Sequence, residues 1–273
     1  MGSEQFFRNA ALALLLAAIA GCAARAPQDA GLWAQVAAPH RAPSNVARDA
    51  HRHPIETLQF FGVRENSTVV EILPGSGGYY MEILAPWLRD KGAYIAANDR
   101  GERSPPQYVA DHQRLVGRLK AEPHLYGKVA LTRFDADRYE VAPAGSADFV
   151  LTFRNLHNWI ERGETEAALR AFHRALKPGG ILGVTDHRGT TALSQEAQMN
   201  TGYVREDVAI AVIEKAGFRL VGRSEVNANP RDTKDHPAGV WTLPPTYRLK
   251  DQDRAKYAAI GESDRFTLKF VKR

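Results

Sequence analysis

A glycine-rich loop near residue 75 has the composition of a loop that binds a nucleotide-like cofactor. The run Val69-Val70-Glu71-Ile72-Leu73 has the β-branched, apolar character of a buried strand, Pro74-Gly75-Ser76-Gly77-Gly78 interrupts it, and a helical pattern follows directly. Glycine accepts positive φ and lets a ligand approach the main chain closely. Strand, tight turn and helix in this order form the first unit of nucleotide-binding α/β folds. The pattern predicts ligand contacts at Gly75 and Gly77.

Polar residues end the first three predicted strands. Glu71 ends the first, Asn98 and Asp99 end the second, and Asp135 ends the third. A carboxylate at the end of the second strand can accept two hydrogen bonds from ribose hydroxyl groups, and Glu71 could take an ammonium group of the ligand. Side chains alternate along a strand, so the register decides whether Asn98 or Asp99 points to the ligand. A solvent-exposed turn is an equal alternative for Asp135, and an ion pair with an arginine is the alternative for Glu71.

The segment 154–159, RNLHNW, contains the candidates for acid–base chemistry. It follows an apolar strand pattern, and Asp186 follows the next strand pattern along the chain. Folds of the α/β class bind ligands beyond the carboxyl ends of their strands. Imidazole titrates near neutral pH, so His157 is a candidate general base, with Asn155 as an orienting group and Asp186 facing the same cleft. The alternative is a segment that caps a turn and packs on the core.

Strand and helix patterns alternate along most of the chain and must position these side chains. Strands are predicted at 68–73, 93–97, 128–134, 147–153, 181–185, 218–225 and 265–271, and helices at 79–90, 107–120, 164–176 and 205–216. A further helical segment starts at Ser44, restarts at Pro54 and ends at Gly62. Alternation implies a parallel sheet with right-handed crossovers. We predict a three-layer α/β/α sandwich with a mainly parallel seven-stranded sheet and an antiparallel last strand.

Residues 68–273 resemble the class I S-adenosylmethionine-dependent methyltransferases, because several landmarks of that superfamily occur in order. These are the loop at 71–78, the polar ends of the second and third strands, Asp148 at the start of the fourth, LKPGG at 176–180, AGF at 216–218 and the terminal strand. A narrower resemblance, at 52–54, 60–63, 71–75, 154–159 and 263–266, is to exported bacterial proteins known as predicted methyltransferases.

The resemblance implies methyl transfer from S-adenosylmethionine to an acceptor that the sequence does not identify. It assigns the cofactor to Glu71, Gly75, Gly77, Asn98, Asp99, Asp135 and Arg154, and the catalytic side to Asn155, His157 and Asp186. The superfamily has glycine where Leu73 stands, which leaves open a non-catalytic module that binds a small molecule or a protein. A dinucleotide-dependent oxidoreductase is disfavoured, because Tyr80 occupies the third glycine position of G-x-G-x-x-G.

Composition excludes some other functions. The chain has 273 residues and a formal net charge of +5, and its basic residues form no run, so we expect no nucleic-acid partner. The nine histidines are dispersed without metal-ligand spacing, so we expect no metal site.

The N-terminus resembles the export signal of a bacterial lipoprotein. An apolar run from Ala10 to Ala20 is too short for a membrane span, and Ile19-Ala20-Gly21-Cys22 resembles a lipobox that contains the single cysteine of the chain. We expect a signal peptide at 1–22, a flexible tether at 23–43 and a folded domain at 44–273. The expected location is the periplasmic face of a membrane, with lipid at Cys22; a cytoplasmic protein is the alternative.

Overall fold

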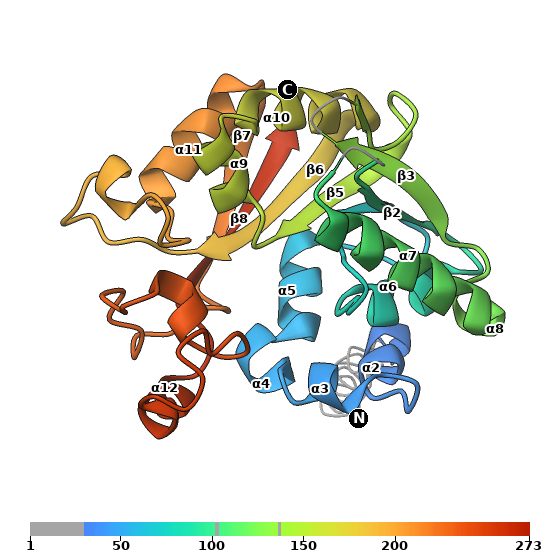
Figure 1. The fold of residues 1–273 in the computed structure, drawn as a ribbon. Coiled ribbons are helices and arrows are strands. Elements are labelled where there is room, and N and C mark those ends of the chain that lie inside the picture. Colours follow the sequence, from blue (N-terminus) through green and yellow to red (C-terminus); the bar gives the residue numbers. More distant parts are fainter. Residues whose placement is uncertain (1–29, 102–103, 136–137) are drawn as a thin grey trace, which may run out of the picture.

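The fold is an eight-stranded mixed sheet with helices on both faces (Figure 1). The computed structural model describes residues 30–101, 104–135 and 138–273. The strands are β1 (Thr68–Ile72), β2 (Ala93–Asp99), β3 (Ala130–Asp135), β4 (Arg138–Glu140), β5 (Ala147–Phe153), β6 (Leu176–His187), β7 (Phe218–Ser224) and β8 (Arg265–Lys272). Their order across the sheet is β4-β3-β2-β1-β5-β6-β8-β7.

The predicted fold class is confirmed. Neighbouring strands from β3 to β6 pair in parallel, and β8 runs antiparallel to both β6 and β7. All seven predicted strands are present, and the short strand β4 adds an eighth at the edge beside β3. Chain order reverses at β1, which lies between β2 and β5, and this switch point is where open α/β sheets form ligand crevices.

Alternating strand residues form two cores, one on each face of the sheet. Val70 and Ile72 of β1 contribute to one core, while Val69 contributes to the other. The helices that cover the first face are α9 (Leu156–Arg162), α10 (Thr165–Ala175) and α11 (Glu206–Lys215). The helices that cover the second face are α2 (Ala30–Val36), α5 (Pro54–Phe61), α6 (Met81–Leu88), α7 (Pro106–Ala121) and α8 (Pro123–Tyr126).

The folded part begins earlier than predicted. Helix α2 lies within the expected tether, and its Leu32 is fully buried against α6, because the segment 30–36 has an apolar face that the composition alone did not reveal. The expected signal peptide and Cys22 lie outside the described residues. None of the described helices is long and apolar enough to cross a membrane.

The helix that was predicted to end at Gly62 has the predicted construction. Helix α5 starts at Pro54 and buries Ile55, Leu58 and Phe61 on one side. Gly62 ends it in the left-handed conformation, with φ of 89°.

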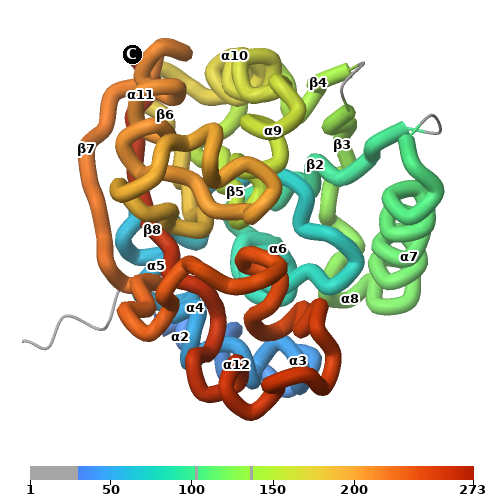
Figure 2. Tube along the Cα trace, turned by 60° about the vertical axis from the view of Figure 1, so that its left-hand side comes forward, coloured from blue at the N-terminus to red at the C-terminus, as the bar shows by residue number. Residues whose placement is uncertain are grey.

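The N-terminal helices lie against the C-terminal segment, far away in the sequence. After the short helix α3 (Pro43–Val46), helix α4 (Asp49–Arg52) lies near the segment that follows α12 (Arg254–Ile260) (Figure 2). Glu262 joins the two regions, since it accepts hydrogen bonds from Arg48 and Arg52. Two short 3-10 helices, Glu196–Gln198 and Gly239–Thr242, complete the described elements.

Candidate active site

Two neighbouring elements fix the glycine loop at the carboxyl end of β1. The Gly75 N–H donates to Oδ1 of Asn98, at the end of β2, over 2.9 Å. The Ser76 N–H and hydroxyl both donate to Asp111 of α7. Gly75 has φ of 66°, which glycine adopts at no steric cost.

Leu73 keeps the backbone conformation of a glycine. Its φ is 52°, in the left-handed region, where a β-carbon clashes with the next carbonyl at a cost of about 1–2 kcal/mol. The Leu73 N–H donates to the Ala97 carbonyl over 3.1 Å, which holds the residue against β2. Leu73 therefore has the backbone conformation suited to the glycine that the resemblance places at this position.

A first cavity of about 370 Å³ lies beside this loop. Its lining includes Leu73, Gly75, Asn98, Arg100, Gln107, Tyr108, Asp111, Arg114, Asn155, Asn158, Trp159 and Arg162. A volume in this range suits a small-molecule ligand. Two aromatic rings, three guanidinium groups and one carboxylate are thus available to a ligand.

Two of the residues predicted for the cofactor, Gly75 and Asn98, line this cavity. The structure also decides between the last two residues of β2: Asn98 is 3% exposed and faces the loop, whereas Asp99 turns to the other side, near Arg133. Asp135 pairs with the same Arg133, over 3.1 Å, and does not line the cavity.

Gly77 and Glu71 lie outside the first cavity. The Gly77 carbonyl accepts hydrogen bonds from Asn45 and Arg118, and a β-carbon on Gly77 would meet no atom within 4 Å. Glu71 is buried beneath the loop and accepts a hydrogen bond from the Tyr94 hydroxyl over 2.6 Å. Burial raises the pKa of Glu71 to about 7. The partner of Glu71 within the protein is thus a tyrosine hydroxyl and not the arginine considered as the alternative above, and its role toward the cofactor stays a prediction.

A second cavity, of about 240 Å³, contains the catalytic candidates. Its lining includes Leu73, Phe153, Arg154, Asn155, His157, Asn158, His187, Val240, Trp241, Pro244, Pro245, Thr246, Glu262 and Ser263. Leu73, Asn155 and Asn158 line both cavities, so the two are neighbours with a common wall. Arg154, which the resemblance assigned to the cofactor, lies in this second cavity.

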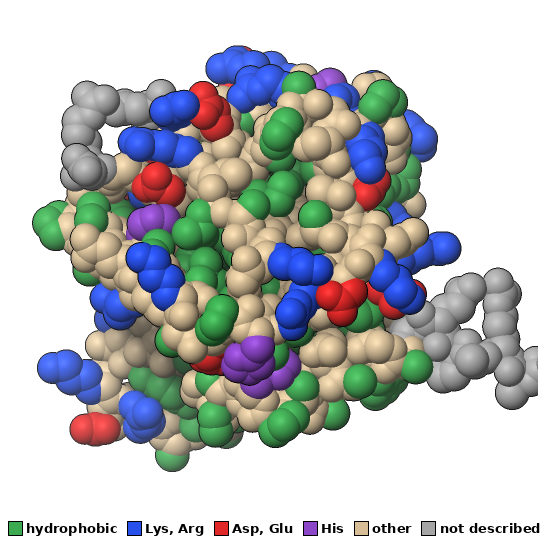
Figure 3. All heavy atoms as spheres, turned by 90° about the vertical axis from the view of Figure 1, so that its right-hand side faces the viewer, with side chains coloured by type: hydrophobic (Ala, Val, Ile, Leu, Met, Phe, Trp, Pro, Cys, Tyr) green, Lys and Arg blue, Asp and Glu red, His purple; other side chains and the backbone are tan. Residues whose placement is uncertain are grey.

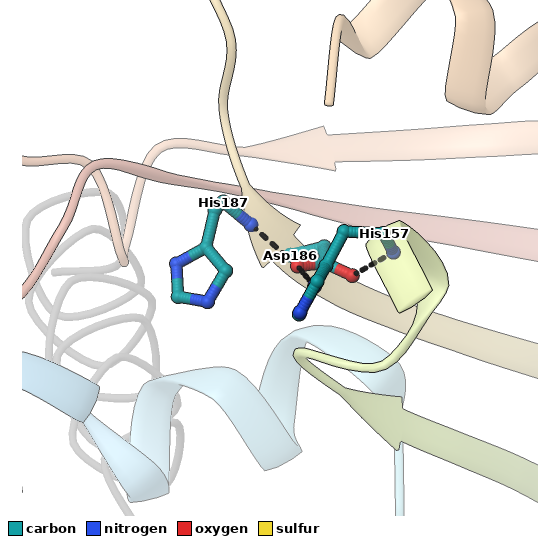
Figure 4. A group of neighbouring side chains, drawn as sticks. All are labelled: His157, Asp186 and His187. Carbon is teal, nitrogen blue, oxygen red and sulfur yellow. Dashed lines mark hydrogen bonds and ion pairs between the residues drawn. The ribbon is translucent and has the colours of Figure 1, made fainter. Parts of the chain in front are cut away.

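His157 and Asp186 form a hydrogen-bonded pair beside the second cavity (Figure 4). Nδ1 of His157 lies 2.9 Å from Oδ1 of Asp186, and the His157 N–H donates to Oδ2 over 3.1 Å. The His187 N–H also donates to Oδ1, over 2.7 Å. Burial opposes ionisation of Asp186, but the neighbouring imidazoles and these hydrogen bonds lower the pKa of its carboxyl below the usual value.

This pairing fixes which ring nitrogen of His157 can accept a proton. A carboxylate only accepts, so its hydrogen bond to His157 requires the proton on Nδ1. Nε2 then carries a lone pair, and Nδ2 of Asn158 lies 2.9 Å from it. Asn155 has a different role, since its Nδ2 donates to the Ile72 carbonyl and to the Thr152 hydroxyl and thereby ties β1 to β5. The arrangement matches a general base with an orienting acid.

The structure also brings His187 close to this pair, which sequence spacing did not predict. His157, Asp186 and His187 offer ligand atoms within 4.8 Å of one another, the spacing of a possible metal site. Their polar atoms are already engaged, because Nδ1 of His187 lies 2.5 Å from the Ser263 hydroxyl and Asp186 accepts three N–H bonds. Figure 4 shows the His187 ring turned away from the carboxylate. These contacts favour acid–base chemistry over metal binding.

Several lining residues were not predicted from the sequence. Tyr108 and Asp111 lie on α7, which was predicted as a helix, but its pattern did not reveal which face meets the loop. Trp159 is 1% exposed and packs against Phe134, as the core interpretation given above expects. It also lines the first cavity.

Comparison with known proteins supports the class I methyltransferase superfamily. Residues 82–184 match a family model described as a methyltransferase domain. The match begins after the glycine loop and covers less than half of the chain. It indicates S-adenosylmethionine as the cofactor. No curated protein matches the chain.

Solved structures share the fold at low identity. A SAM-dependent methyltransferase from Aquifex aeolicus has a TM-score of 0.56 and 17% identity, over 85% of this chain and 95% of that one. The [4+2]-cyclase SpnF has a TM-score of 0.54 and 17% identity, over 90% of this chain and 93% of that one. The molecule therefore has the class I methyltransferase fold. The relation of the chain to the exported bacterial proteins stays a prediction.

Proposed function

We propose that the protein transfers a methyl group from S-adenosylmethionine to a small acceptor. The observation that carries this proposal is the pair of cavities that meet at Leu73, Asn155 and Asn158, beyond the carboxyl ends of β1, β2 and β5. One cavity has the glycine loop and the other has the His157–Asp186 pair. Two adjoining cavities suit a cofactor and an acceptor, because the acceptor atom must align with the bond between the sulfur and the methyl group.

The first cavity has a lining whose polar and aromatic side chains suit the cofactor. Asn98 is placed to bind ribose through its amide, and Tyr108 and Trp159 offer aromatic surfaces for the adenine. Asp111 is the carboxylate in the lining, facing Arg100, Arg114 and Arg162. This excess of positive charge favours the cofactor's carboxylate over its sulfonium. The demethylated product, which lacks the sulfonium charge, should therefore bind more tightly than the cofactor itself.

The protein's own residues would orient the acceptor and move one proton. The bound cofactor supplies a methyl group on a cationic sulfur. Nε2 of His157 takes the proton from an acceptor hydroxyl or amine, while Asp186 stabilises the ring that becomes charged. The residues common to both linings would keep the two reactants adjacent.

Binding of the cofactor tests the proposal, and two adjacent residues offer a matched pair of variants. Calorimetry should detect S-adenosylmethionine and its demethylated product with the unmodified protein. Asn98→Leu should abolish that binding, and Asp99→Asn, on the opposite side of β2, should preserve it. Absence of binding by the unmodified protein at millimolar cofactor would refute the function.

A second candidate is a non-catalytic binding module, or other chemistry, on the same fold. Leu73 in the left-handed conformation favours it, because its side chain stands in the lining of both cavities, where the superfamily has none. The cyclase with this fold is an example of another reaction. S-adenosylmethionine with a labelled methyl group, incubated with envelope extract, distinguishes the two candidates. Transfer of the label by the parent but not by His157→Ala supports methyl transfer. Binding of the cofactor without transfer of the label supports the binding module.

We further propose that the protein is a lipoprotein on the periplasmic face of a bacterial membrane. The lipobox-like Ile19-Ala20-Gly21-Cys22 and the absence of any other cysteine support this location. Basic side chains on the face in Figure 3 are spread among hydrophobic ones, so that face has no concentrated basic patch. The described residues start at Ala30, eight positions after the proposed anchor at Cys22.

A further inference from the structure

Arg154 introduces a cation into the second cavity that forms no ion pair within the part of the chain that the structure describes. Within residues 30–101, 104–135 and 138–273, no carboxylate lies within 4.0 Å of its guanidinium, and its side chain has no hydrogen bond. Burial and the nearby Arg52 lower the pKa of Arg154 to about 9. The surroundings therefore disfavour the charged form of this side chain.

The nearest carboxylate is already committed to three other arginines. Glu262 accepts from Nε of Arg48 over 2.7 Å, from Nε of Arg52 over 3.1 Å and from Nη1 of Arg265 over 2.7 Å. All of these side chains except Arg48 are at most 5% exposed. Four guanidinium groups thus surround one carboxylate.

Asp186 and Glu71, two further buried acids whose charges act on Arg154, do not correct this balance. Asp186 is used by His157 and by the N–H of His187. Glu71 is hydrogen-bonded to Tyr94, and its pKa is raised to about 7, so it carries only part of a charge at neutral pH. Arg154 is half-buried at the cavity and has no close counter-charge, so the cavity is electrostatically prepared for an anion.

The backbone of Arg154 is held in a conformation that a non-glycine residue rarely adopts. Its φ is 61°, and its N–H donates to the Thr185 carbonyl over 2.7 Å, which fixes the residue at the end of β5. Strain of this kind persists where the surrounding structure imposes it and is frequent at ligand sites. The fold thus holds the main chain from which the guanidinium extends.

The rest of the cavity shows what kind of anion fits. Hydroxyl groups of Thr246 and Ser263 lie in one part of the lining, and Trp241, Pro244 and Pro245 supply apolar surface. We propose that this cavity binds a small organic carboxylate with an apolar body, held by Arg154. A guanidinium matches a carboxylate with two parallel hydrogen bonds. This inference rests on the proposed function in so far as the carboxylate is taken to be the methyl acceptor.

Benzoate, benzyl alcohol and inorganic phosphate test the site without any cofactor. Calorimetry and thermal melting of the unmodified protein should show binding of benzoate, and weaker or no binding of the neutral alcohol and of phosphate. Arg154→Gln should weaken benzoate binding about tenfold or more. Arg154→Lys keeps the charge but loses the planar guanidinium, so its affinity for benzoate should lie between those of the parent and of Arg154→Gln. Arg219→Gln, on the exposed side of β7, is the control and should bind like the parent.

Melting temperature without ligand separates a binding role from a structural one. Removing an unpaired, half-buried charge should leave the melting temperature of Arg154→Gln equal to or above that of the parent. Equal binding of benzoate and benzyl alcohol, stronger binding of phosphate, or benzoate binding that survives Arg154→Gln would overturn the proposal. Benzoate binding without cofactor binding would refute the methyltransferase function and keep this site; the reverse result would refute the site alone.

Discussion

His157 and Asp186 are joined by two hydrogen bonds although 29 residues separate them in the sequence. One reaches the ring and the other reaches the main chain at the start of α9. Asn155, at the N-cap of α9, makes no side-chain capping bond, so the buried carboxylate of β6 takes that role. A single carboxylate therefore sets both the start of the helix and the orientation of the candidate base.

His157→Ala should lower turnover by about 10²–10⁴-fold, the usual contribution of a general base, while cofactor affinity stays unchanged. His157 lines only the second cavity, which is the reason for this separation. Steady-state kinetics and calorimetry measure the two effects. Asp186→Asn should also lower turnover, and adding it to His157→Ala should cause little further loss, because the two residues act as a unit. If His157→Ala lost cofactor affinity as much as turnover, His157 would instead belong to the residues that bind the cofactor.

Glu71→Gln should make the protein more stable at pH 8 and change little at pH 4. The pKa of Glu71 is about 7 in the folded protein and 4.5 for the unperturbed group, so the folded state binds this proton more tightly. The contribution of Glu71 to stability is therefore present below pH 4.5 and is lost as the pH rises through 7, at a cost of about 3 kcal/mol. Gln can still accept from the Tyr94 hydroxyl. Urea unfolding at both pH values checks this, with the exposed Glu161→Gln as control; equal shifts at both pH values would argue against it.

Leu73→Gly should be more stable than Leu73→Ala by about 1 kcal/mol. Both changes remove the side chain, but only glycine relieves the left-handed backbone strain. Urea unfolding of the two variants gives the difference. The same pair of changes at Leu131, an exposed residue of β3, should show the opposite order, since glycine weakens an ordinary strand. If alanine is the better residue at both positions, Leu73 is not strained.

Cys22→Ser should release the protein from membranes or leave it unprocessed. Lipid attachment requires the thiol, and the multiple chains of a lipoprotein hold a protein firmly to a bilayer. Fractionation and mass spectrometry of the N-terminus measure the outcome, with Ala24→Ser as a neighbouring control. Normal processing and membrane retention of the serine variant would contradict the proposed anchor.

The main elements of the sheet could be predicted because their signals are local. Runs such as 147–153 are apolar and β-branched, and the helix that starts at Pro54 and ends at Gly62 has its apolar residues at helical spacing. Elements with weak local signals were missed. Strand β4 has only three residues, and α9 starts within a polar segment because its N-terminal partner, Asp186, belongs to another strand.

The site could be predicted only as far as the edge of the sheet where it lies. The sequence predicted Gly75, Asn155, His157 and Asp186 as candidate site residues. It could not choose between Asn98 and Asp99, because a shift of one residue in the strand register exchanges the two. The partner of Glu71 is Tyr94 on the neighbouring strand, and the approach of His187 to His157 joins the end of β6 to the start of α9. Such contacts arise from tertiary packing, which periodicity does not encode.

The common wall of the two cavities has a thermodynamic consequence. Leu73, Asn155 and Asn158 belong to both linings, so a ligand that shifts any of them in one cavity changes the free energy of binding in the other. Such linkage is reciprocal: whatever factor the first ligand imposes on the affinity of the second, the second imposes on the first. Occupancy of the two cavities is therefore coupled, and the order in which the ligands arrive cannot change the total free energy of forming the ternary complex.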